Sequence, residues 1–556
     1  MRKQNTIFMM ITVLIFTVSF NLSSLTQTAQ ANTTGESTED KQHSTSLPPY
    51  KKTLPINVDV ETKQEIHWGN ADIINYYDRI EDVRYTYEID TKPKSYLKVT
   101  KRRLDNGDQF IFTTLENHSD NAVDVKVSIS IANTGYYSLK SFDQYMTGPR
   151  SNSSIHVDLT TGPLGLLTTY KDKAFNSNVM VGKQYHSKEL TKNYQDGRRS
   201  VLRELINEDQ GIDIDAQKND LNLVIDMESK GNDMVDHWLL YSDESLFESD
   251  ASYKEWIRIY NNKKYKNNNW YTADGPYRKV GRTAEPKPES ELQYARNLLI
   301  VREDEPLKRY KETEERYFYN LLLNSITNLA IFKGDDEFYE TEYTNRWLNR
   351  AYGIEPPYID TRHNEGVALF LEETGEILDI PEIQKALTNY ADLLVNQINT
   401  GQVVEVGPNA SLISDYFTFN QDDVGVTHSS LNHVLGGMNL LLQTYNDTGE
   451  KKYLTAATYV QNGIDALGDK WLTDEGDTWY QISPDHTFSG EDYPRLTLND
   501  LLLSLELWEG IDSSRTQTLE MLIKSKANYL ANNDISFTKE MIASMKKHGF
   551  GEIIQK

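Results

Sequence analysis

The chain has 556 residues, which is long for one ordinary hydrophobic core, so two domains are expected. Its hydrophobic fraction of 38% and charged fraction of 25% are those of a globular protein, not of a disordered or polytopic membrane protein. The formal net charge of −25 argues against nucleic acid and anionic lipid as partners, and the lack of cysteine excludes thiolate metal sites and cysteine nucleophiles.

The N-terminus has the features of an export signal. Two basic residues precede an apolar run over residues 7–20, and Ala29 and Ala31 supply the small residues of a cleavage site. We therefore predict a signal peptide over residues 1–31 and a polar, disordered spacer over 32–50. Export without cysteine favours a secreted, extracellular or cell-wall-associated protein of a Gram-positive-type bacterium, with no integral membrane association after signal cleavage.

The first half of the chain is predicted to form β-strands. Apolar residues mostly alternate between residues 54 and 242, and the Asp-Asn-Gly-Asp sequence at residues 105–108 predicts a hairpin turn. The clearest strand candidates are residues 95–101, 109–115, 122–131, 221–227 and 237–242. Many short strands separated by turn signals favour an antiparallel β-sandwich over residues 51–260.

Residues 261–300 are rich in Lys, Arg, Asn and Tyr. We expect an exposed linker between domains there, and the alternative is a basic patch for a negatively charged glycan. The acidic residues 209–220 lack the glycine and glutamate spacing of a calcium loop. We therefore expect no metal, and no motif in the chain implies a cofactor.

The second half changes to the 3.6-residue period of helices. Helices are predicted over residues 317–332, 365–373, 383–398, 430–445, 452–467 and 498–508. Glycine-containing breaks at 333–335, 374–375, 448–449 and 510–511 predict tight turns. The fold class is therefore α+β multidomain, with the N-terminal antiparallel β-sandwich followed by a small (α/α) toroid of about four helical hairpins over residues 301–535 and a tail over 536–556.

Three longer loops, at residues 352–364, 401–429 and 472–497, separate the predicted hairpins. If the tight turns share one end of the array, these loops gather at the other end and form the mouth of a cleft. Their carboxylates, histidines and tyrosines suit sugar binding, although the 34 tyrosines of the chain are also typical of β-rich secreted proteins. The substrate-binding candidates are Arg362, Glu365, Asp415, Tyr416, His428, Asn432 and Trp479.

Several of these residue types have structural alternatives. Arg362 and Glu365 are spaced to pair with each other on one helix. His433 is expected to be a hydrogen-bonded interior histidine, and Thr427 and Ser429 are candidate helix N-caps. No motif of a metalloprotease, serine hydrolase or nucleotide-binding enzyme is present.

The third loop, DTWYQISPDHTFSGEDYPRLTLNDLLLSLELWEGI, resembles the C-terminal segment of the D-glucuronyl 5-epimerases. The matching positions are Asp477, Tyr480, Tyr493, Thr497, Asn499 and Leu501. The likeness extends over the helical half of the chain, and the order of a β-rich region followed by a helical toroid is similar to that of the family. It implies an isomerase of carbohydrate metabolism that acts on a polysaccharide or oligosaccharide containing uronic acid.

The resemblance also implies a mechanism. Carbon 5 of a uronic acid residue is inverted when one group removes its proton and another returns a proton to the opposite face. Tyr480 and Tyr493 would be the acid/base pair, with Arg495 or Arg362 neutralising the substrate carboxylate. A neighbouring cation would lower the pKa of a tyrosine that acts as the base.

Other functions remain open at this stage. A polysaccharide lyase shares the first proton abstraction, and a glycoside hydrolase would use a carboxylate pair from Glu365, Asp415, Asp422 and Asp492. A non-catalytic secreted glycan-binding protein is the alternative outside enzymes. The oligomeric state is also open, with a homodimer as one option.

Overall fold

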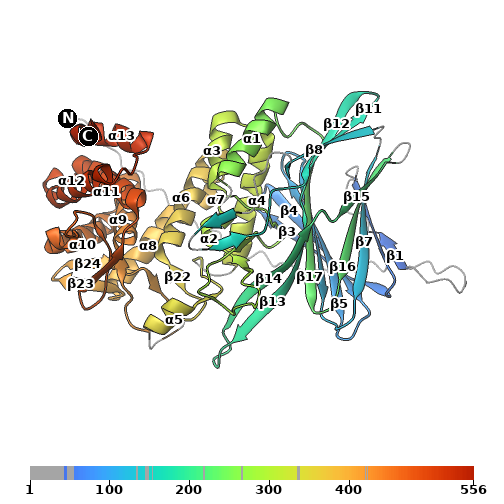
Figure 1. Ribbon diagram of the computed structural model, residues 1–556, viewed down its shortest axis with the longest axis horizontal. Helices are drawn as coiled ribbons and strands as arrows, with labels where there is room; N and C mark the ends of the chain where they lie inside the picture. The colour runs from blue at the N-terminus through green and yellow to red at the C-terminus, as the bar shows by residue number, and fades with distance from the viewer. Residues whose placement is uncertain are drawn as a thin grey trace, which may run out of the picture. The chain divides into compact units, whose positions relative to one another are not determined.

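The computed structural model describes residues 43–46, 56–132, 136–143, 150–152, 155–216, 220–263, 267–334, 338–419, 421 and 424–555. The predicted signal peptide and most of the predicted spacer lie outside the described residues. The described chain is a mixed α+β protein with large antiparallel sheets first and helices after them (Figure 1). No helix in this part of the chain combines the length and the apolar character needed to cross a membrane.

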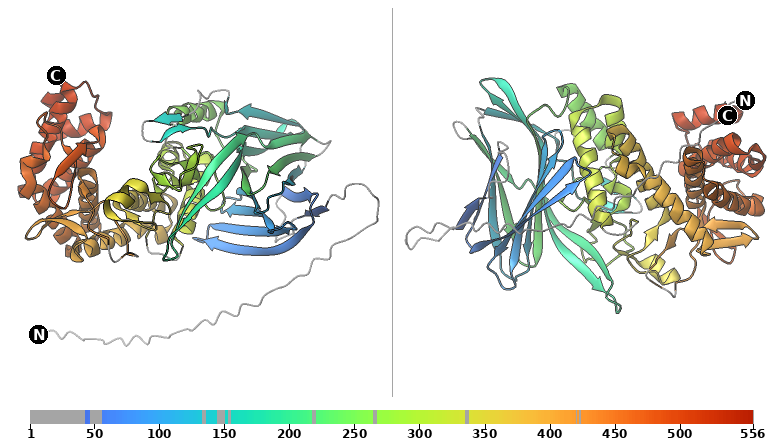
Figure 2. Two further views of the ribbon diagram at one scale, coloured as in Figure 1. Left: turned by 60° about the horizontal axis from the view of Figure 1, so that its bottom comes forward. Right: turned by 180° about the vertical axis from the view of Figure 1, so that it is seen from behind.

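Two antiparallel sheets form the predicted sandwich (Figure 2). The smaller sheet has the order β1 (His43–Ser46), β2 (Ile56–Thr62), β7 (Val123–Ala132), β16 (Asp220–Ser229) and β15 (Ile212–Ala216). The larger sheet contains β3 (Ile66–Tyr76), β4 (Ile80–Ile89), β5 (Ser95–Leu104), β6 (Gln109–Asn117), β8 (Tyr136–Ser141), β11 (Gly165–Lys171), β12 (Ala174–Val181), β13 (Gln184–Asn193), β14 (Arg199–Asp209), β17 (Asp233–Ser242), β18 (Tyr277–Lys279) and β20 (Gln293–Arg296). Alternate residues of both sheets, mostly Val, Ile and Leu, fill the core between them.

The centre of the larger sheet is buried on both faces, because helices cover the face that points away from the smaller sheet. Every residue of β17 is buried. Val235 and Leu239 belong to the core between the sheets, whereas Trp238 and Leu240 pack with side chains of α1 (Asp250–Asn262) and α4 (Arg316–Lys333). Sheet and helices therefore share one hydrophobic core on that side.

A ladder of polar side chains on α4 also joins the helices to the larger sheet. Arg316, Asn320, Asn324 and Asn328 recur every four residues and lie on one helix face. The fully buried Asp108, at the predicted β5–β6 hairpin turn, accepts from Arg316 Nε at 2.8 Å and from Asn320 Nδ2 at 2.6 Å. The hairpin turn thus binds the first half of the ladder.

Arg102 in β5 binds the second half of the ladder. Its buried guanidinium donates to Asn324 Oδ1 at 2.6 Å and to Asn328 Oδ1 at 2.7 Å. It also donates to the two carboxylate oxygens of Asp82 at 2.8 and 2.9 Å and to the Ala273 carbonyl at 2.7 Å. Arg102 is therefore satisfied on all sides, as a buried cation must be.

The predicted exposed linker is largely incorrect. Trp270 and Tyr271 are buried in the core shared by sheet and helices, and β18 and β20 extend the larger sheet. The alternative of a basic patch is not supported either, since Arg278 is buried and Arg282 pairs with Glu291 at 3.1 Å. A composition rich in Asn and Tyr suggested an exposed segment. These side chains can nevertheless be buried when their polar groups are hydrogen-bonded.

Glu303 is one of the buried groups that this segment surrounds. Its Oε1 accepts from Asn268 Nδ2 at 2.9 Å and from the Tyr271 hydroxyl. Burial raises the pKa of Glu303 to about 7, and the hydrogen bonds from Tyr271 and Asn268 oppose this only in part.

A Glu303→Gln variant is expected to become more stable relative to the wild type as the pH rises. Between the ordinary pKa of 4.5 and about 7 the unfolded wild type releases a proton that the folded protein retains, so its stability falls through this window. Gln keeps the acceptor for Asn268 and Tyr271 but does not titrate, so its relative gain above the window should be on the order of 1–3 kcal/mol. Urea unfolding on both sides of the window measures it, with the exposed Glu289→Gln as control. Parallel pH profiles for Glu303→Gln and the wild type would contradict the prediction.

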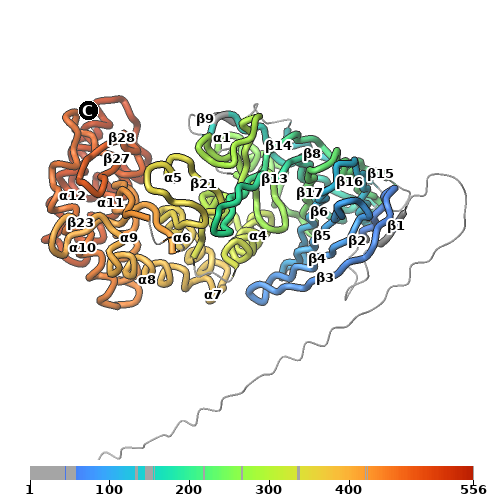
Figure 3. The backbone as a smooth tube through the Cα atoms, turned by 90° about the horizontal axis from the view of Figure 1, so that it is seen from below, coloured from blue at the N-terminus to red at the C-terminus, as the bar shows by residue number. Residues whose placement is uncertain are grey.

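The C-terminal half is an array of helical hairpins (Figure 3). The described hairpins are α3 (Asp304–Thr313) with α4, α6 (Thr361–Leu378) with α8 (Ala386–Asn399), α9 (Leu431–Thr448) with α10 (Lys451–Leu467), and α11 (Pro494–Ile511) with α12 (Gln517–Asn532). α6, α9 and α11 pack side by side in one row, and α8 and α10 form a second row. Four hairpins are present, as predicted, but α4 pairs with the preceding α3 and not with a helix after the predicted turn at 333–335. α11 and α12 lie at the opposite end of the array from α4, so the described array is an open arc (Figure 1).

Shorter elements complete the described chain. The helices are α2 (Leu298–Val301), α5 (Arg346–Tyr352), α7 (Pro381–Gln384) and α13 (Lys539–Lys547), the last of which packs on α11. The short strand pairs outside the site are β9 (Arg150–Asn152) with β10 (His156–Asp158), β19 (Ala284–Glu285) with β21 (Thr344–Asn345), and β23 (Val403–Gly407) with β24 (Ala410–Ile413).

The predicted glycine turns hold at two positions and fail at the other two, where Gly375 and Gly510 lie inside α6 and α11. Gly334 and Gly449 end α4 and α9 with φ of 59° and 70°, which only glycine adopts readily. Gly375 instead lies inside α6, which ends at Asp379. A Cβ at Gly375 would lie 2.8 Å from Ile383 Cγ1, so this glycine permits close packing of α7 and does not make a turn.

Candidate functional site

The three long loops meet at one end of the helical array, as the alternation of loop lengths predicts. β22 (Ile359–Asp360) pairs with β25 (Tyr416–Phe417) and joins the first loop to the second. β26 (Ser429–Ser430) pairs with β27 (Trp479–Ile482), which pairs with β28 (Phe488–Glu491), so the second and third loops are joined as well. β22 and β26 lead directly into α6 and α9, and Tyr493, just after β28, is the N-cap of α11.

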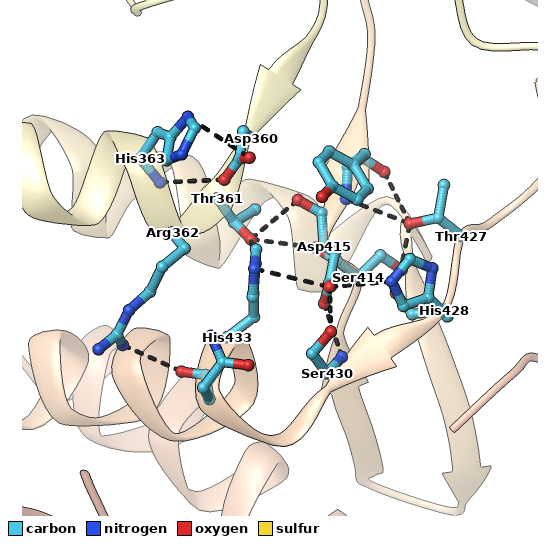
Figure 4. A network of polar contacts seen from close by, with 12 residues as sticks. Asp360, Thr361, Arg362, His363, Ser414, Asp415, Thr427, His428, Ser430 and His433 are labelled. Atoms are coloured by element: carbon cyan, nitrogen blue, oxygen red, sulfur yellow. Dashed lines mark hydrogen bonds and ion pairs between the residues drawn. The ribbon is translucent and has the colours of Figure 1, made fainter. Parts of the chain in front are cut away.

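A buried carboxylate lies at the centre of these loops (Figure 4). Asp415 is fully buried, and its Oδ1 accepts from the Ser430 backbone N–H at 2.6 Å. Its Oδ2 accepts from the Ser430 hydroxyl and lies 3.0 Å from His428 Nε2 and 3.6 Å from His433 Nε2. One serine and two histidines on the second loop and the start of α9 therefore surround a single carboxylate from the same loop.

The charge state of this cluster follows from its partners. Burial alone would raise the pKa of Asp415, but His433, His428 and Ser430 together lower it below its ordinary value. Burial lowers the pKa of His433, although Asp415 opposes this. His433 Nδ1 lies 2.7 Å from the Thr361 hydroxyl, so His433 is the hydrogen-bonded interior histidine that the sequence predicts.

His428 differs from His433 in having one ring nitrogen without a partner. Its Nε2 faces Asp415, whereas its buried Nδ1 has no hydrogen-bond partner among the residues that the structure describes. The imidazole stacks on Tyr352 at 5.7 Å and meets the edge of Trp347 at 5.3 Å between ring centroids. Two aromatic side chains of α5 thus cover the histidine.

Tyr480 and Tyr493 are in contact, with ring centroids 5.7 Å apart and planes at 84°. Burial and the Asp415 charge raise the pKa of both tyrosines. Ser430, which donates its own hydroxyl proton to Asp415, opposes the rise in the Tyr480 pKa, but burial has the larger effect.

The expectation that a cation lowers the pKa of one of these tyrosines is incorrect. Arg495 donates to the Ser536 carbonyl at 2.8 Å and to its hydroxyl at 2.9 Å, so its guanidinium binds the segment after α12. The contact between Tyr480 and Tyr493 also leaves no room for a sugar ring between their rings, so in this arrangement they cannot act from opposite faces of a substrate.

Arg362 forms an interior ion-pair network instead of a free cationic site. It pairs with Glu365 and with Asp500, each at 3.0 Å, and donates to the Asn432 carbonyl at 3.0 Å. Burial raises the pKa of Glu365 to about 7, and Arg362 opposes the shift. Gly436 faces this network, and a Cβ there would lie 1.8 Å from Arg362 Nη1. Arg362 and Glu365 therefore pair with each other on one helix, which is the structural alternative to a substrate-binding role.

The remaining predicted residues lie close to the cluster. The ring of Tyr416 lies 5.8 Å from that of His428 and 6.1 Å from that of His433. Trp479 is half-buried in β27. Thr427 does not cap α9, since the N-cap is Ser430, and its hydroxyl accepts from the Tyr416 backbone N–H at 3.1 Å.

Residues of α5 are the part of the site that sequence reasoning missed. α5 precedes the first long loop, so Trp347 and Tyr352 fall at or before the loop boundary. A usable signal was Asn345, whose side chain accepts from the Trp347 backbone N–H at 3.1 Å as a helix N-cap. Only the folded chain places these aromatics against His428.

The chain matches no protein-family profile and no curated protein. Solved structures similar to it include a cellobiose 2-epimerase from Bacillus thermoamylovorans, with 11% identity over 52% of this chain and 71% of that chain and a TM-score of 0.37. A family 76 glycoside hydrolase from a bovine Bacteroides thetaiotaomicron strain has 12% identity over 83% and 78%, with a TM-score of 0.33. An unsaturated glucuronyl hydrolase from Bacillus sp. GL1 has 10% identity over 46% and 72%, with a TM-score of 0.28. At such low scores none of them is evidence for the function of this chain.

Proposed function

We propose that this chain is a secreted carbohydrate-active enzyme that moves protons on uronic acid residues of a polysaccharide, with inversion of carbon 5 as its reaction. The observation that carries the proposal is the Asp415 cluster, in which Ser430 and His428 hold the carboxylate and the Asp415 charge acts on Tyr480. The cluster places a partly exposed phenol near a buried carboxylate and a histidine, which are the group types that acid/base catalysis uses.

Tyr480 is suited to return a proton to carbon 5. Burial, together with the Asp415 charge, raises its pKa, so its hydroxyl stays protonated at neutral pH. Tyr493, half exposed and in edge contact with the Tyr480 ring, is then a wall of the site and not the second reacting group.

His428 is suited to remove the proton. Asp415, as an ionised acceptor, holds the proton of a neutral imidazole on Nε2 and leaves the lone pair on Nδ1. When the C5–H bond breaks, Nδ1 takes the proton, the electron pair moves into the substrate carboxylate, and Asp415 stabilises the imidazolium. Because Nδ1 is buried, substrate reaches it only after the Tyr352 ring that stacks on the imidazole moves aside.

The hydrolase alternative is weakened by the state of its carboxylates. Asp415 is committed to Ser430 and His428, Glu365 to Arg362, and Asp492 to Lys526 at 2.7 Å. Asp422 lies outside the described residues. A water-activating pair needs carboxylates that face the glycosidic bond, and these three face protein partners.

A second candidate function is glycan binding without chemistry. It is favoured by the raised pKa of both Tyr480 and Tyr493, since a tyrosine base needs the opposite shift. Partly exposed aromatic side chains such as Trp347 and Tyr493 suit stacking on sugars whether or not a reaction follows.

Incubation of the mature protein with acidic polysaccharides in heavy water separates these functions. Epimerisation predicts deuterium at carbon 5 without chain cleavage, read by NMR. An unsaturated product absorbing in the ultraviolet indicates a lyase, and new reducing ends indicate a hydrolase. A bound polysaccharide that keeps its proton, mass and stereochemistry overturns the catalytic proposal in favour of binding.

A further inference from the structure

Two arginines of α5, Arg346 and Arg350, lie beside the candidate site. Arg346 and Arg350 are four residues apart and so share one helix face. Among the described residues, neither guanidinium lies within ion-pair distance of a carboxylate or donates a hydrogen bond. In a chain with a net charge of −25, two neighbouring unpaired arginines are a local surplus of positive charge.

The carboxylates nearest to α5 in sequence do not neutralise this pair. Glu342 accepts from Arg296 Nε at 3.0 Å, and Glu355 pairs with Arg198 at 3.0 Å. The cations of the proposed reaction site, Arg362 and Arg495, are committed elsewhere. Among the described residues near the site, the guanidinium groups that have no carboxylate partner and could bind a uronate are therefore those of Arg346 and Arg350.

The two arginines border a cavity. It has a volume of about 360 Å³ and is lined by Thr283, Arg346, Trp347, Arg350 and Ala351. Trp347 lines this cavity and its indole also meets the edge of the His428 ring, so one residue borders both the cavity and the candidate site. Indole and guanidinium groups together offer a stacking surface for a sugar ring and donors for a carboxylate.

We propose that Arg346, Arg350 and Trp347 form a subsite for a carboxylate-bearing sugar residue of the polysaccharide. The carboxylate accepts hydrogen bonds from both guanidinium groups, and the sugar ring stacks on the indole. The inference rests on the proposed function for its substrate class, but it concerns binding alone. It also supplies the positive charge that the substrate needs next to the reacting residues.

The test compares binding of a short oligomer of glucuronic acid with that of a neutral glucose oligomer of equal length, by calorimetry. The R346Q/R350Q variant should bind the acidic oligomer about 10- to 100-fold more weakly and the neutral one almost unchanged. The matched control is K254Q/R258Q on α1, which removes the same charge at the same spacing from residues paired with Asp250 and Glu255. This control should bind both oligomers like the wild type.

The outcomes separate this subsite from the reaction. If R346Q/R350Q binds the acidic oligomer as tightly as the wild type, or if the wild type binds no acidic oligomer, the subsite is wrong. Equal loss in the K254Q/R258Q control, or equally tight wild-type binding of an oligonucleotide of the same charge, also overturns it, since only net charge would then matter. If acidic oligomers bind through the arginines but exchange no deuterium at carbon 5, the subsite stands and the proposed reaction fails.

Discussion

Replacement of Tyr480 by phenylalanine is expected to lower the rate of deuterium entry at carbon 5 about 100- to 10,000-fold, the contribution of a positioned general acid. The variant keeps the ring contact with Tyr493 and loses only the phenolic hydroxyl. Ser430 remains bound to Asp415, so the fold and the binding of the acidic oligomer should be nearly unchanged. NMR of the exchanged polysaccharide measures the rate, and calorimetry measures the binding.

Two further tyrosine variants serve as controls for Tyr480. Tyr529→Phe makes the same chemical change on a half-buried residue of α12 and should leave the rate unchanged. Tyr493→Phe keeps the edge contact with Tyr480 and should retain activity within about tenfold, because we assign it no proton transfer. Full activity in a folded Tyr480→Phe protein would show that another group returns the proton.

Replacement of Arg102 by methionine is expected to lower the free energy of unfolding by about 3–5 kcal/mol. The substitution leaves the carboxylate of Asp82 buried without its main partner and removes both donors to Asn324 and Asn328. It therefore weakens the larger sheet and its attachment to α4 together. Urea unfolding followed by circular dichroism measures the loss.

The neighbouring Arg103 provides the matched control for Arg102. It is the next residue in β5, about a quarter exposed, and pairs with Glu81 at 3.2 Å. Arg103→Met should cost about 1 kcal/mol or less, as expected of a partly exposed ion pair. The D82N/R102M double variant should recover part of the loss, because it removes the buried charge along with its partner. Equal losses for Arg102→Met and Arg103→Met would contradict a special role for the buried arginine.

Much of the fold could be predicted because its elements follow simple periods. The alternation at 95–101 and 109–115 and the glycine at 449 specify local structure by themselves. Burial of Trp270 and Tyr271 could not be predicted in this way, since it depends on contacts with α4 and the larger sheet. Gly375 failed for the same reason, because its partner Ile383 belongs to another helix.

The sequence predicted which loops form the site, but not which side chains contact each other within it. The alternation of loop lengths correctly predicted that three loops lie close together, namely residues 352–364, 401–429 and 472–497. The strand pairs that hold them are only two residues long at β22 and β26, too short to leave a sequence pattern. Arg495 was misassigned because its partner Ser536 is far along the chain. The arginines of α5 could not be recognised either, since no pattern in the sequence tells an unpaired arginine from a paired one.

The polar ladder of α4 also constrains how such a chain could grow during evolution. Repeat arrays lengthen by duplication of a unit at a place where neighbouring units are not fixed to something else. Here the first hairpin is tied to the sheet through Arg102 and Asp108, so a copied hairpin inserted between α4 and the sheet would break buried hydrogen bonds and the Arg316–Asp108 ion pair. The last hairpin is covered by short helices, with α13 on α11 and Gly551–Gln555 on α12, and α13 buries Met541 and Met545. Descendants with a longer array would therefore carry the added hairpin between α12 and α13.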